Sequence, residues 1–127
     1  VRAIHDAGKF SYIHTCGKIN DRLEMMSQSG PTGLECLDPP PIGNVKLDEA
    51  FSRIGNRMFI KGNIDSVNTL LKANDAVIRQ DILNRIQTGM SYRGFILSTA
   101  CSIAPGVKAE RVRMITEMTR QYGNYNS

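Results

Sequence analysis

The segment Gly94-Phe-Ile-Leu-Ser-Thr-Ala100 decides the fold, because it is the clearest β-strand pattern in the chain. Its aromatic and branched residues are typical of a strand that is at least half buried. A helical pattern follows at Lys108–Tyr122. Four apolar residues are expected on one side of that helix: Val112, Ile115, Met118 and Tyr122. A strand followed by a helix is the βα unit from which parallel sheets are built.

The same order recurs three times upstream. Strand patterns lie at residues 10–15, 34–37 and 58–60, and the helical patterns after them lie at 19–29, 47–54 and 75–87. A short helix is also expected at 66–71, and residues 1–8 read as the end of a helix closed by glycine. Asn74 is expected to cap the helix at 75–87, with Ile78, Ile82 and Ile86 on one face.

Strands that alternate with helices predict parallel strands joined by right-handed crossovers. Two architectures fit this α/β pattern: a doubly wound sheet and part of a (β/α)8 barrel. The sequence holds neither G-x-G-x-x-G after the first strand nor G-x-x-x-x-G-K-[ST], so nucleotide-binding sheets lose their main support. With 127 residues and 41% hydrophobic content, we expect one compact domain.

Charge and composition exclude several partners. The 16 basic residues exceed the 12 acidic ones by four, but they stand singly and no aromatic residues interleave with them. This favours a solvated surface and no nucleic-acid partner. No apolar stretch approaches the roughly 18 residues that span a bilayer, and the three cysteines are an odd number, typical of reduced thiols. We expect a soluble cytoplasmic protein without a membrane partner.

Three side chains of the types that bind zinc lie at predicted strand ends. His14 and Cys16 share one face at the end of the first strand, and Cys101 ends the last strand. Active sites of parallel α/β folds lie at this carboxyl edge. Two thiolates and one imidazole leave a zinc position open for a water or a substrate. The alternative interpretation is a core histidine with small buried cysteines.

Further candidates surround the predicted second strand. Cys36 lies within it and is expected in the core. Glu35 and Asp38 flank Cys36, and each is a candidate fourth ligand or proton donor, although Asp38 also fits a cap for the turn before the prolines. His5 is expected to be solvated.

Four segments together resemble the C-terminal half of the uroporphyrinogen decarboxylase superfamily. They are His14-Thr-Cys16-Gly17, Gly33-Leu-Glu-Cys-Leu-Asp38, Lys61-Gly62-Asn63-Ile64-Asp65 and Gly94-Phe-Ile-Leu-Ser-Thr-Ala-Cys101-Ser-Ile-Ala-Pro105. That superfamily is a (β/α)8 TIM barrel that includes porphyrinogen decarboxylases and zinc-dependent methyltransferases linked to corrinoids. The resemblance implies that residues 1–127 form one domain, the last four βα units of eight.

Two departures from the decarboxylases imply the methyltransferase branch. Decarboxylases carry a Gly-His-Gly type sequence where this chain has Ala100-Cys101-Ser102, and they lack His-x-Cys-Gly. The resemblance then implies zinc on His14, Cys16 and Cys101, with Asn63 as a candidate pocket residue. The implied reaction moves a methyl group from a corrinoid, such as methylcobalamin, to a small thiol. The chain lacks an Asp-x-His-x-x-Gly pattern, so the corrinoid is expected on a partner protein.

Two alternatives remain open. A uroporphyrinogen decarboxylase would need a pocket without a cofactor, in which arginines hold the substrate carboxylates. An inactive half-barrel would have two open strand edges to cover, and it would pair with a second copy or with the other half.

Overall fold

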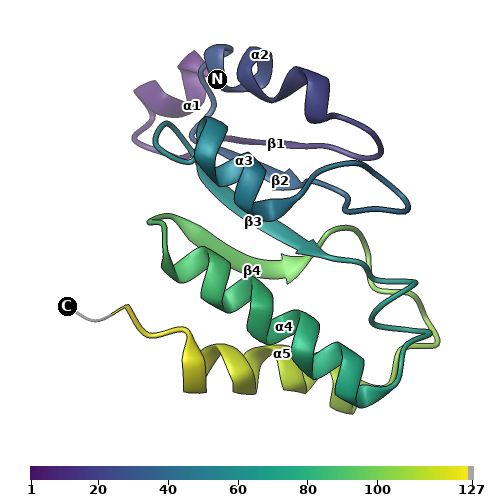
Figure 1. The fold of residues 1–127 in the computed structure, drawn as a ribbon. Coiled ribbons are helices and arrows are strands. Elements are labelled where there is room, and N and C mark those ends of the chain that lie inside the picture. The colour runs from purple at the N-terminus through teal and green to yellow at the C-terminus, as the bar shows by residue number, and fades with distance from the viewer. Residues whose placement is uncertain (126–127) are drawn as a thin grey trace.

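The computed structural model describes residues 1–125 as one parallel sheet with helices between its strands (Figure 1). The strands are β1 (Tyr12–His14), β2 (Gly33–Cys36), β3 (Phe59–Ile64) and β4 (Phe95–Thr99). The helices are α1 (Arg2–Asp6), the 3-10 turn η1 (Asn20–Arg22), α2 (Leu23–Gln28), α3 (Leu47–Ile54), α4 (Asp75–Met90) and α5 (Ala109–Tyr122). Within these residues, none of the helices is both long and apolar enough to cross a membrane.

The strands lie side by side in chain order, β1-β2-β3-β4, and each neighbouring pair is parallel. A doubly wound sheet reverses its strand order at a switch point, whereas consecutive units of a barrel do not. Of the two architectures that the sequence allowed, the described residues therefore have the barrel type. The prediction of an α/β fold with four parallel βα units is confirmed.

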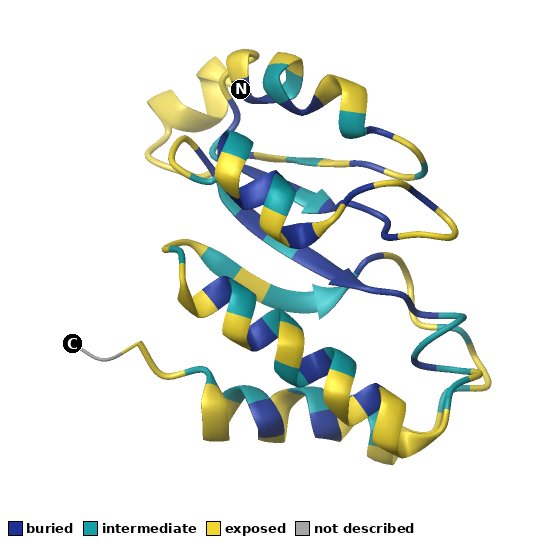
Figure 2. Cartoon of the chain, in the orientation of Figure 1, coloured by how far each residue is buried: buried dark blue, intermediate teal, exposed yellow. Residues whose placement is uncertain are grey.

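Successive side chains of each strand point to opposite faces of the sheet. Ile13, Leu34 and Ile60 are neighbours across β1, β2 and β3, and they pack in one core with α2 and α3. One residue further along, His14 and Glu35 are neighbours on the opposite face. Figure 2 shows buried residues along the middle strands and on the sides of α3 and α4 that face the sheet. One face of the sheet therefore packs against the helices, and the opposite face carries His14 and Glu35.

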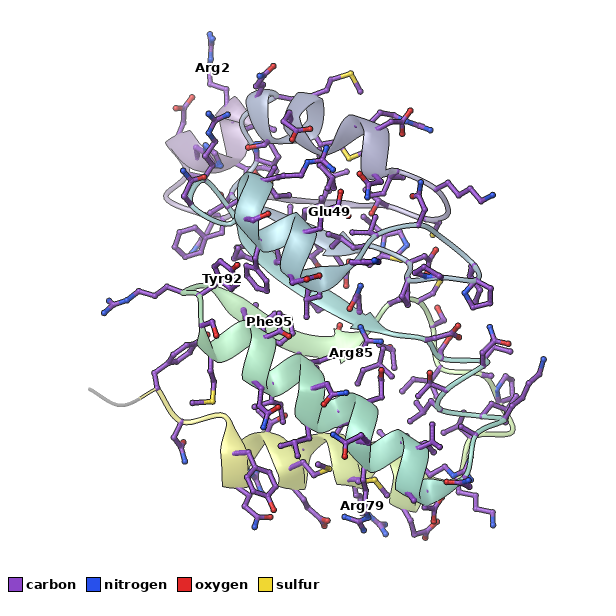
Figure 3. All side chains as sticks on the ribbon, in the orientation of Figure 1. Arg2, Glu49, Arg79, Arg85, Tyr92 and Phe95 are labelled. Atoms are coloured by element: carbon purple, nitrogen blue, oxygen red, sulfur yellow. The ribbon has the colours of Figure 1, made fainter. Side chains whose placement is uncertain are left out.

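Aromatic packing fixes α3 and α4 against β4. The Phe51 ring stacks on Tyr92, with centroids 4.6 Å apart, and meets Phe95 edge-on at 5.5 Å. Tyr92 and Phe95 lie close together beside β4 in Figure 3. A Cβ on Gly89 of α4 would lie 1.9 Å from the Phe95 ring, so only glycine admits this approach.

A second core joins α4 to α5. The predicted stripe of Ile78, Ile82 and Ile86 is buried, and the Asn74 side chain caps α4 by accepting a hydrogen bond from the Val77 amide at 2.9 Å. The apolar stripe predicted for α5 is confirmed in part, because Met118 is buried and Ile115 packs against this core. Tyr122 is instead 43% exposed, and Met114, which the stripe did not include, is buried.

The short helix predicted at 66–71 was also wrong, because the segment forms consecutive turns. The buried Asp65 carboxylate accepts hydrogen bonds from the backbone amides of Val67 and Asn68, at 2.9 and 2.8 Å. A side chain that binds the backbone two and three residues ahead offers an alternative to helical hydrogen bonds. His5, expected to be solvated, is exposed, and its ring also lies 3.0 Å from the Ser11 hydroxyl.

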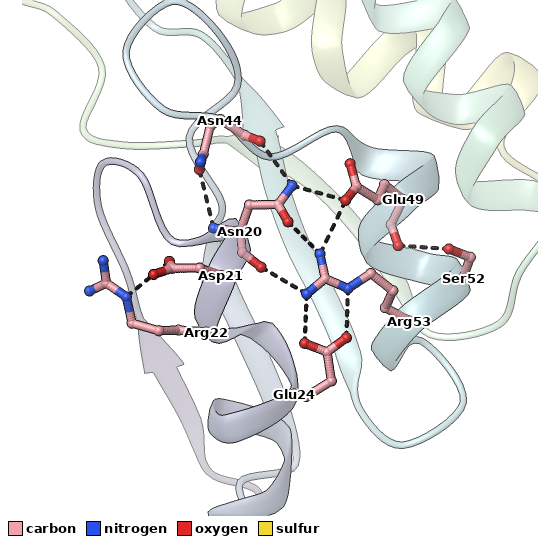
Figure 4. A network of polar contacts seen from close by, with 8 residues as sticks. All are labelled: Asn20, Asp21, Arg22, Glu24, Asn44, Glu49, Ser52 and Arg53. Atoms are coloured by element: carbon pink, nitrogen blue, oxygen red, sulfur yellow. Dashed lines mark hydrogen bonds and ion pairs between the residues drawn. The ribbon is translucent and has the colours of Figure 1, made fainter.

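A network around Arg53 joins α2 to α3 (Figure 4). The Arg53 guanidinium donates two hydrogen bonds of 2.6 Å to the two carboxylate oxygens of Glu24, and it also contacts Asn20 and Glu49. This hydrogen bonding lowers the pKa of Glu24 to about 2. The bidentate geometry orders the two helices on the outside of the sheet.

Candidate metal centre

The predicted ligands all lie at the carboxyl edge of the sheet, at the arrowheads of the strands in Figure 1. His14 is the last residue of β1, and Cys16 follows two residues later. Cys36 is the last residue of β2, and Cys101 lies two residues beyond the end of β4. The parallel topology therefore brings residues that are far apart in the sequence to one rim.

His14 has a different partner on each ring nitrogen. Its Nε2 atom lies 3.3 Å from the Cys16 sulfur, and its Nδ1 atom lies 3.2 Å from Oε2 of Glu35. The other Glu35 oxygen pairs with the Lys61 ammonium. A carboxylate on the far nitrogen is the usual partner of a metal-binding histidine, because it sets the tautomer and the ring orientation. The Nε2 atom is thereby directed at the Cys16 sulfur.

Lys61 is itself held in place on the open face of the sheet. Its Nζ atom lies 5.9 Å from the centre of the Tyr12 ring, and that ring meets Phe59 edge-on at 6.0 Å. Gly33 lies under Phe59, where a Cβ would come within 2.3 Å of the ring. Glu35 and its partners therefore form a supported polar row beside the candidate ligands.

The ligand atoms of His14, Cys16 and Cys36 all lie within 4.8 Å of one another. Tetrahedral zinc bonds sulfur at about 2.3 Å and nitrogen at about 2.0 Å, so its ligands lie roughly 3.5 to 3.8 Å apart. The 3.3 Å between His14 and Cys16 is close to this spacing. The donor types and the spacing of His14 and Cys16 thus fit a zinc ion.

Cys101, the third predicted ligand, does not belong to this group of ligand atoms, although its charge acts on the Cys16 thiol. Loss of hydration is the largest cause that raises the pKa of the exposed Cys16 thiol, and the charge of the neighbouring Cys101 is the next. Burial raises the pKa of Cys36 as well, with the Asp38 carboxylate as the second cause. Thiols in this environment favour the neutral form, and a bound cation is what would hold them as thiolates.

Two polar residues fix the loop that carries Cys16. The Thr15 hydroxyl donates a hydrogen bond to the Glu35 carbonyl at 2.9 Å. The buried Asp38 carboxylate accepts a hydrogen bond from the Gly17 amide at 2.7 Å. Gly17 has φ +75°, a left-handed conformation that glycine adopts without strain. Asp38 therefore holds the end of β1 close to the end of β2.

Asn63 lies below this rim and is fully buried. Its amide nitrogen donates a hydrogen bond to the Leu37 carbonyl at 2.9 Å, and its amide oxygen accepts one from Arg85 of α4. Arg85, labelled in Figure 3, is in turn paired with Asp81 at 2.7 Å. Both ends of the Asn63 amide are thus hydrogen-bonded, and the amide nitrogen supports Leu37, the residue that follows Cys36.

Sequence reasoning placed Cys36 in the core, and the structure agrees that it is buried. The structure also places the Cys36 sulfur in the group with His14 and Cys16, which the sequence did not predict. Cys36 and Leu37 have φ values of +83° and +53°, which are rare for residues with a side chain. The sequence holds no signal for this backbone conformation.

Comparison with known proteins shows which family and which relatives this chain resembles. The family described as uroporphyrinogen decarboxylase (URO-D) matches residues 1–122. The methylcobamide:CoM methyltransferase MtaA of Methanosarcina barkeri is 29% identical over 110 residues, and that of strain Fusaro is 30% identical. Each alignment covers 87% of this chain and 30% of the relative.

A solved structure, a methyltransferase from Methanosarcina mazei, has the same fold. It superposes with a TM-score of 0.79 at 22% sequence identity, and the match covers 97% of this chain and 34% of that one. The chain thus spans about a third of the length of the proteins it matches.

Proposed function

The chain belongs to the uroporphyrinogen decarboxylase family. We propose that it is part of a zinc-dependent methyltransferase and carries the metal centre at the carboxyl edge of its sheet. In this proposal, the protein moves a methyl group from a corrinoid to a thiol acceptor. Its relatives in the comparison are methyltransferases, and two are named for methylcobamide and CoM. The described units would be the last four of eight in a barrel.

One observation carries the proposal: His14 Nε2 and the Cys16 sulfur lie 3.3 Å apart, with a carboxylate on the other nitrogen of His14. A histidine that served only the core would not direct one nitrogen at a thiol on an exposed rim. His14, Cys16 and Cys101 would hold the zinc. When bound, zinc would lower the pKa of an acceptor thiol and so supply the thiolate that attacks the methyl group.

The other residues position this centre. Glu35 orients His14 and is itself neutralised by Lys61. Asp38 holds the loop of Cys16 through the Gly17 amide. Both carboxylates remain candidates for a direct role, as a fourth ligand or a proton donor. Asn63 remains a candidate pocket residue, although its present contacts are those of a support for the end of β2.

The decarboxylase alternative needs arginines free to bind substrate carboxylates. In the described residues, five arginines pair with carboxylates: Arg22 with Asp21, Arg53 with Glu24 and Glu49, Arg85 with Asp81, Arg111 with Asp75, and Arg113 with Glu110. The rim instead offers sulfur and imidazole, which suit zinc. This donor chemistry of the rim favours the methyltransferase over the decarboxylase.

The test is methyl transfer from methylcobalamin to small thiols by the zinc-loaded chain, followed by the absorbance change of the corrinoid. We expect transfer that depends on added zinc and is abolished in His14→Ala. Binding of the thiol is measured separately on a cobalt-substituted chain, in which a new sulfur ligand adds charge-transfer absorbance.

Glu49→Gln is the matched control, since it removes a carboxylate whose described partners are Asn20 and Arg53. The control should behave as the unaltered chain in both assays. A folded, metal-loaded chain that neither transfers methyl groups nor binds thiols would overturn the proposed function.

A further inference from the structure

Cys16 and Cys36 lie at the ends of two neighbouring parallel strands, and their sulfur atoms are within 4.8 Å of each other. Both thiols are free, but Cys16 is exposed whereas Cys36 is fully buried. The proposed zinc centre uses the Cys16 thiol and gives Cys36 no part in the chemistry. Two thiols at this distance can join in a disulfide if the backbone holds them at the spacing that the bridge requires.

Hydrogen bonds from Thr15, the residue before Cys16, reach the residues on both sides of Cys36. The Thr15 amide and hydroxyl both donate to the Glu35 carbonyl, at 3.1 and 2.9 Å, and the Leu37 amide donates to the Thr15 hydroxyl at 3.4 Å. Neighbouring strands lie about 4.7–4.9 Å apart, which is within the roughly 4.4–6.8 Å between α-carbons that a disulfide spans. The backbone around the two cysteines therefore has the spacing of a bridged pair.

The backbone of Cys36 also departs from the regular pattern of its strand. In regular alternation Cys36 would share the helix-covered face with Leu34. Its φ of +83°, followed by +53° at Leu37, breaks that alternation at the last residue of β2. Such left-handed residues with side chains cost free energy and concentrate at functional sites. The buried amide of Asn63 holds the Leu37 carbonyl at 2.9 Å, so the turn that places the Cys36 sulfur near Cys16 is supported.

We propose that Cys16 and Cys36 form a reversible disulfide, and that this modification and zinc binding at Cys16 exclude each other. Only the thiolate form of cysteine is a metal ligand, so the Cys16 sulfur is lost to the metal centre while the bridge is present. The inference rests on the proposed function for zinc at Cys16, and it adds a redox control of that site. Reduction of the bridge restores the ligand.

A small disulfide such as glutathione disulfide is the oxidant in this proposal. The exposed Cys16 thiol loses its proton and attacks one sulfur of that disulfide, whose S–S bond breaks and releases one glutathione, which takes up the proton. The Cys36 thiol then loses its proton, attacks the Cys16 sulfur of the mixed disulfide and releases the second glutathione. Two cysteine thiols are thereby oxidised, and one glutathione disulfide is reduced to two glutathione thiols.

The test is equilibration of the metal-free chain in glutathione redox buffers, followed by alkylation and peptide mapping by mass spectrometry. A pH of about 8 is used, since the raised pKa of both thiols slows thiol–disulfide exchange. Cleavage after lysine and arginine places the three cysteines on separate peptides, residues 10–18, 23–46 and 94–108. We expect the main product to join the first two peptides.

Zinc affinity of the oxidised chain, measured by competition with a chelating dye, should fall by more than the roughly 100-fold that loss of an outer-shell partner costs. Dithiothreitol should restore the affinity, and zinc added before the oxidant should prevent the bridge. These readouts need no activity assay.

Cys36→Ala should lose the bridge and accumulate a glutathione adduct on Cys16, whereas the matched control Cys101→Ser should still form the bridge. Circular dichroism establishes that each variant is folded. A bridge from Cys16 to Cys101, or glutathione adducts without any bridge in the folded unaltered chain, would overturn the proposal. A chain that forms the bridge but binds no zinc when reduced would instead overturn the proposed function and leave the disulfide standing.

Discussion

His14 and Glu35 lie on neighbouring strands, and Nδ1 of His14 is 3.2 Å from Oε2 of Glu35. The imidazole is therefore fixed between a carboxylate on one side and the Cys16 sulfur on the other. Residues one strand apart thus combine into a single ordered group of candidate ligands. The account makes predictions for this group and for the fold that supports it.

Glu35→Gln should weaken zinc binding roughly 10- to 100-fold while the chain remains folded, because the amide orients His14 less firmly and adds no charge. Chelator competition measures the affinity. Glu49→Gln, with its carboxylate on α3, is the control and should bind zinc as the unaltered chain does. If the two variants bound zinc with equal affinity, Glu35 would have no role in the metal centre.

Asn63→Leu should lower the free energy of unfolding by about 1–3 kcal/mol, because the Leu37 carbonyl and Arg85 lose a partner in a buried place. Denaturant titration measures this value. The exposed Asn84→Ala on α4 should change it by about 0.5 kcal/mol or less. If Asn63→Leu were equally mild, the buried amide would not be supporting the end of β2.

Gly89→Ala tests the packing of α4 on β4. Alanine favours a helix over glycine by about 1 kcal/mol, yet the new Cβ would lie 1.9 Å from the Phe95 ring. We expect the steric cost of this contact to exceed the gain in helix propensity, so that the variant is less stable by about 1–3 kcal/mol. Gln87→Ala, two residues earlier and exposed, is the matched control. A stabilised Gly89→Ala variant would contradict the close approach of the two elements.

Acid should weaken the link between α2 and α3. The pKa of Glu24 is lowered to about 2 by its hydrogen bonds with Arg53, from an ordinary value of 4.5. A lowered folded pKa means that the stabilisation is complete above about pH 4.5 and is lost as the pH falls toward 2. As the pH falls from 4.5 to 2, the unfolding temperature should decrease less steeply in Glu24→Gln than in the unaltered chain.

Asp21→Asn is the control for this prediction, since it removes the carboxylate of an exposed ion pair with Arg22. Its pH profile should follow the unaltered chain. Identical profiles for Glu24→Gln and the unaltered chain would show that the Arg53 network does not carry this pH dependence.

Local patterns predicted much of the fold. The helix expected at 47–54 has those bounds, and the ligands expected at strand ends lie at the carboxyl rim. The turns at 66–71 escaped prediction because the Asp65 side chain competes with helical hydrogen bonds there. The same limit applies to Cys36, whose place in the site depends on a left-handed backbone and on the nearness of β1.

The measurement that tests the central claim most directly is the zinc content of the purified, reconstituted chain, together with Cys16→Ser and Cys101→Ser. The account predicts about one zinc per chain, weakened or lost in both variants while circular dichroism shows them folded. A folded chain without zinc, or variants that hold it as tightly as the unaltered chain, would contradict a metal centre at this rim.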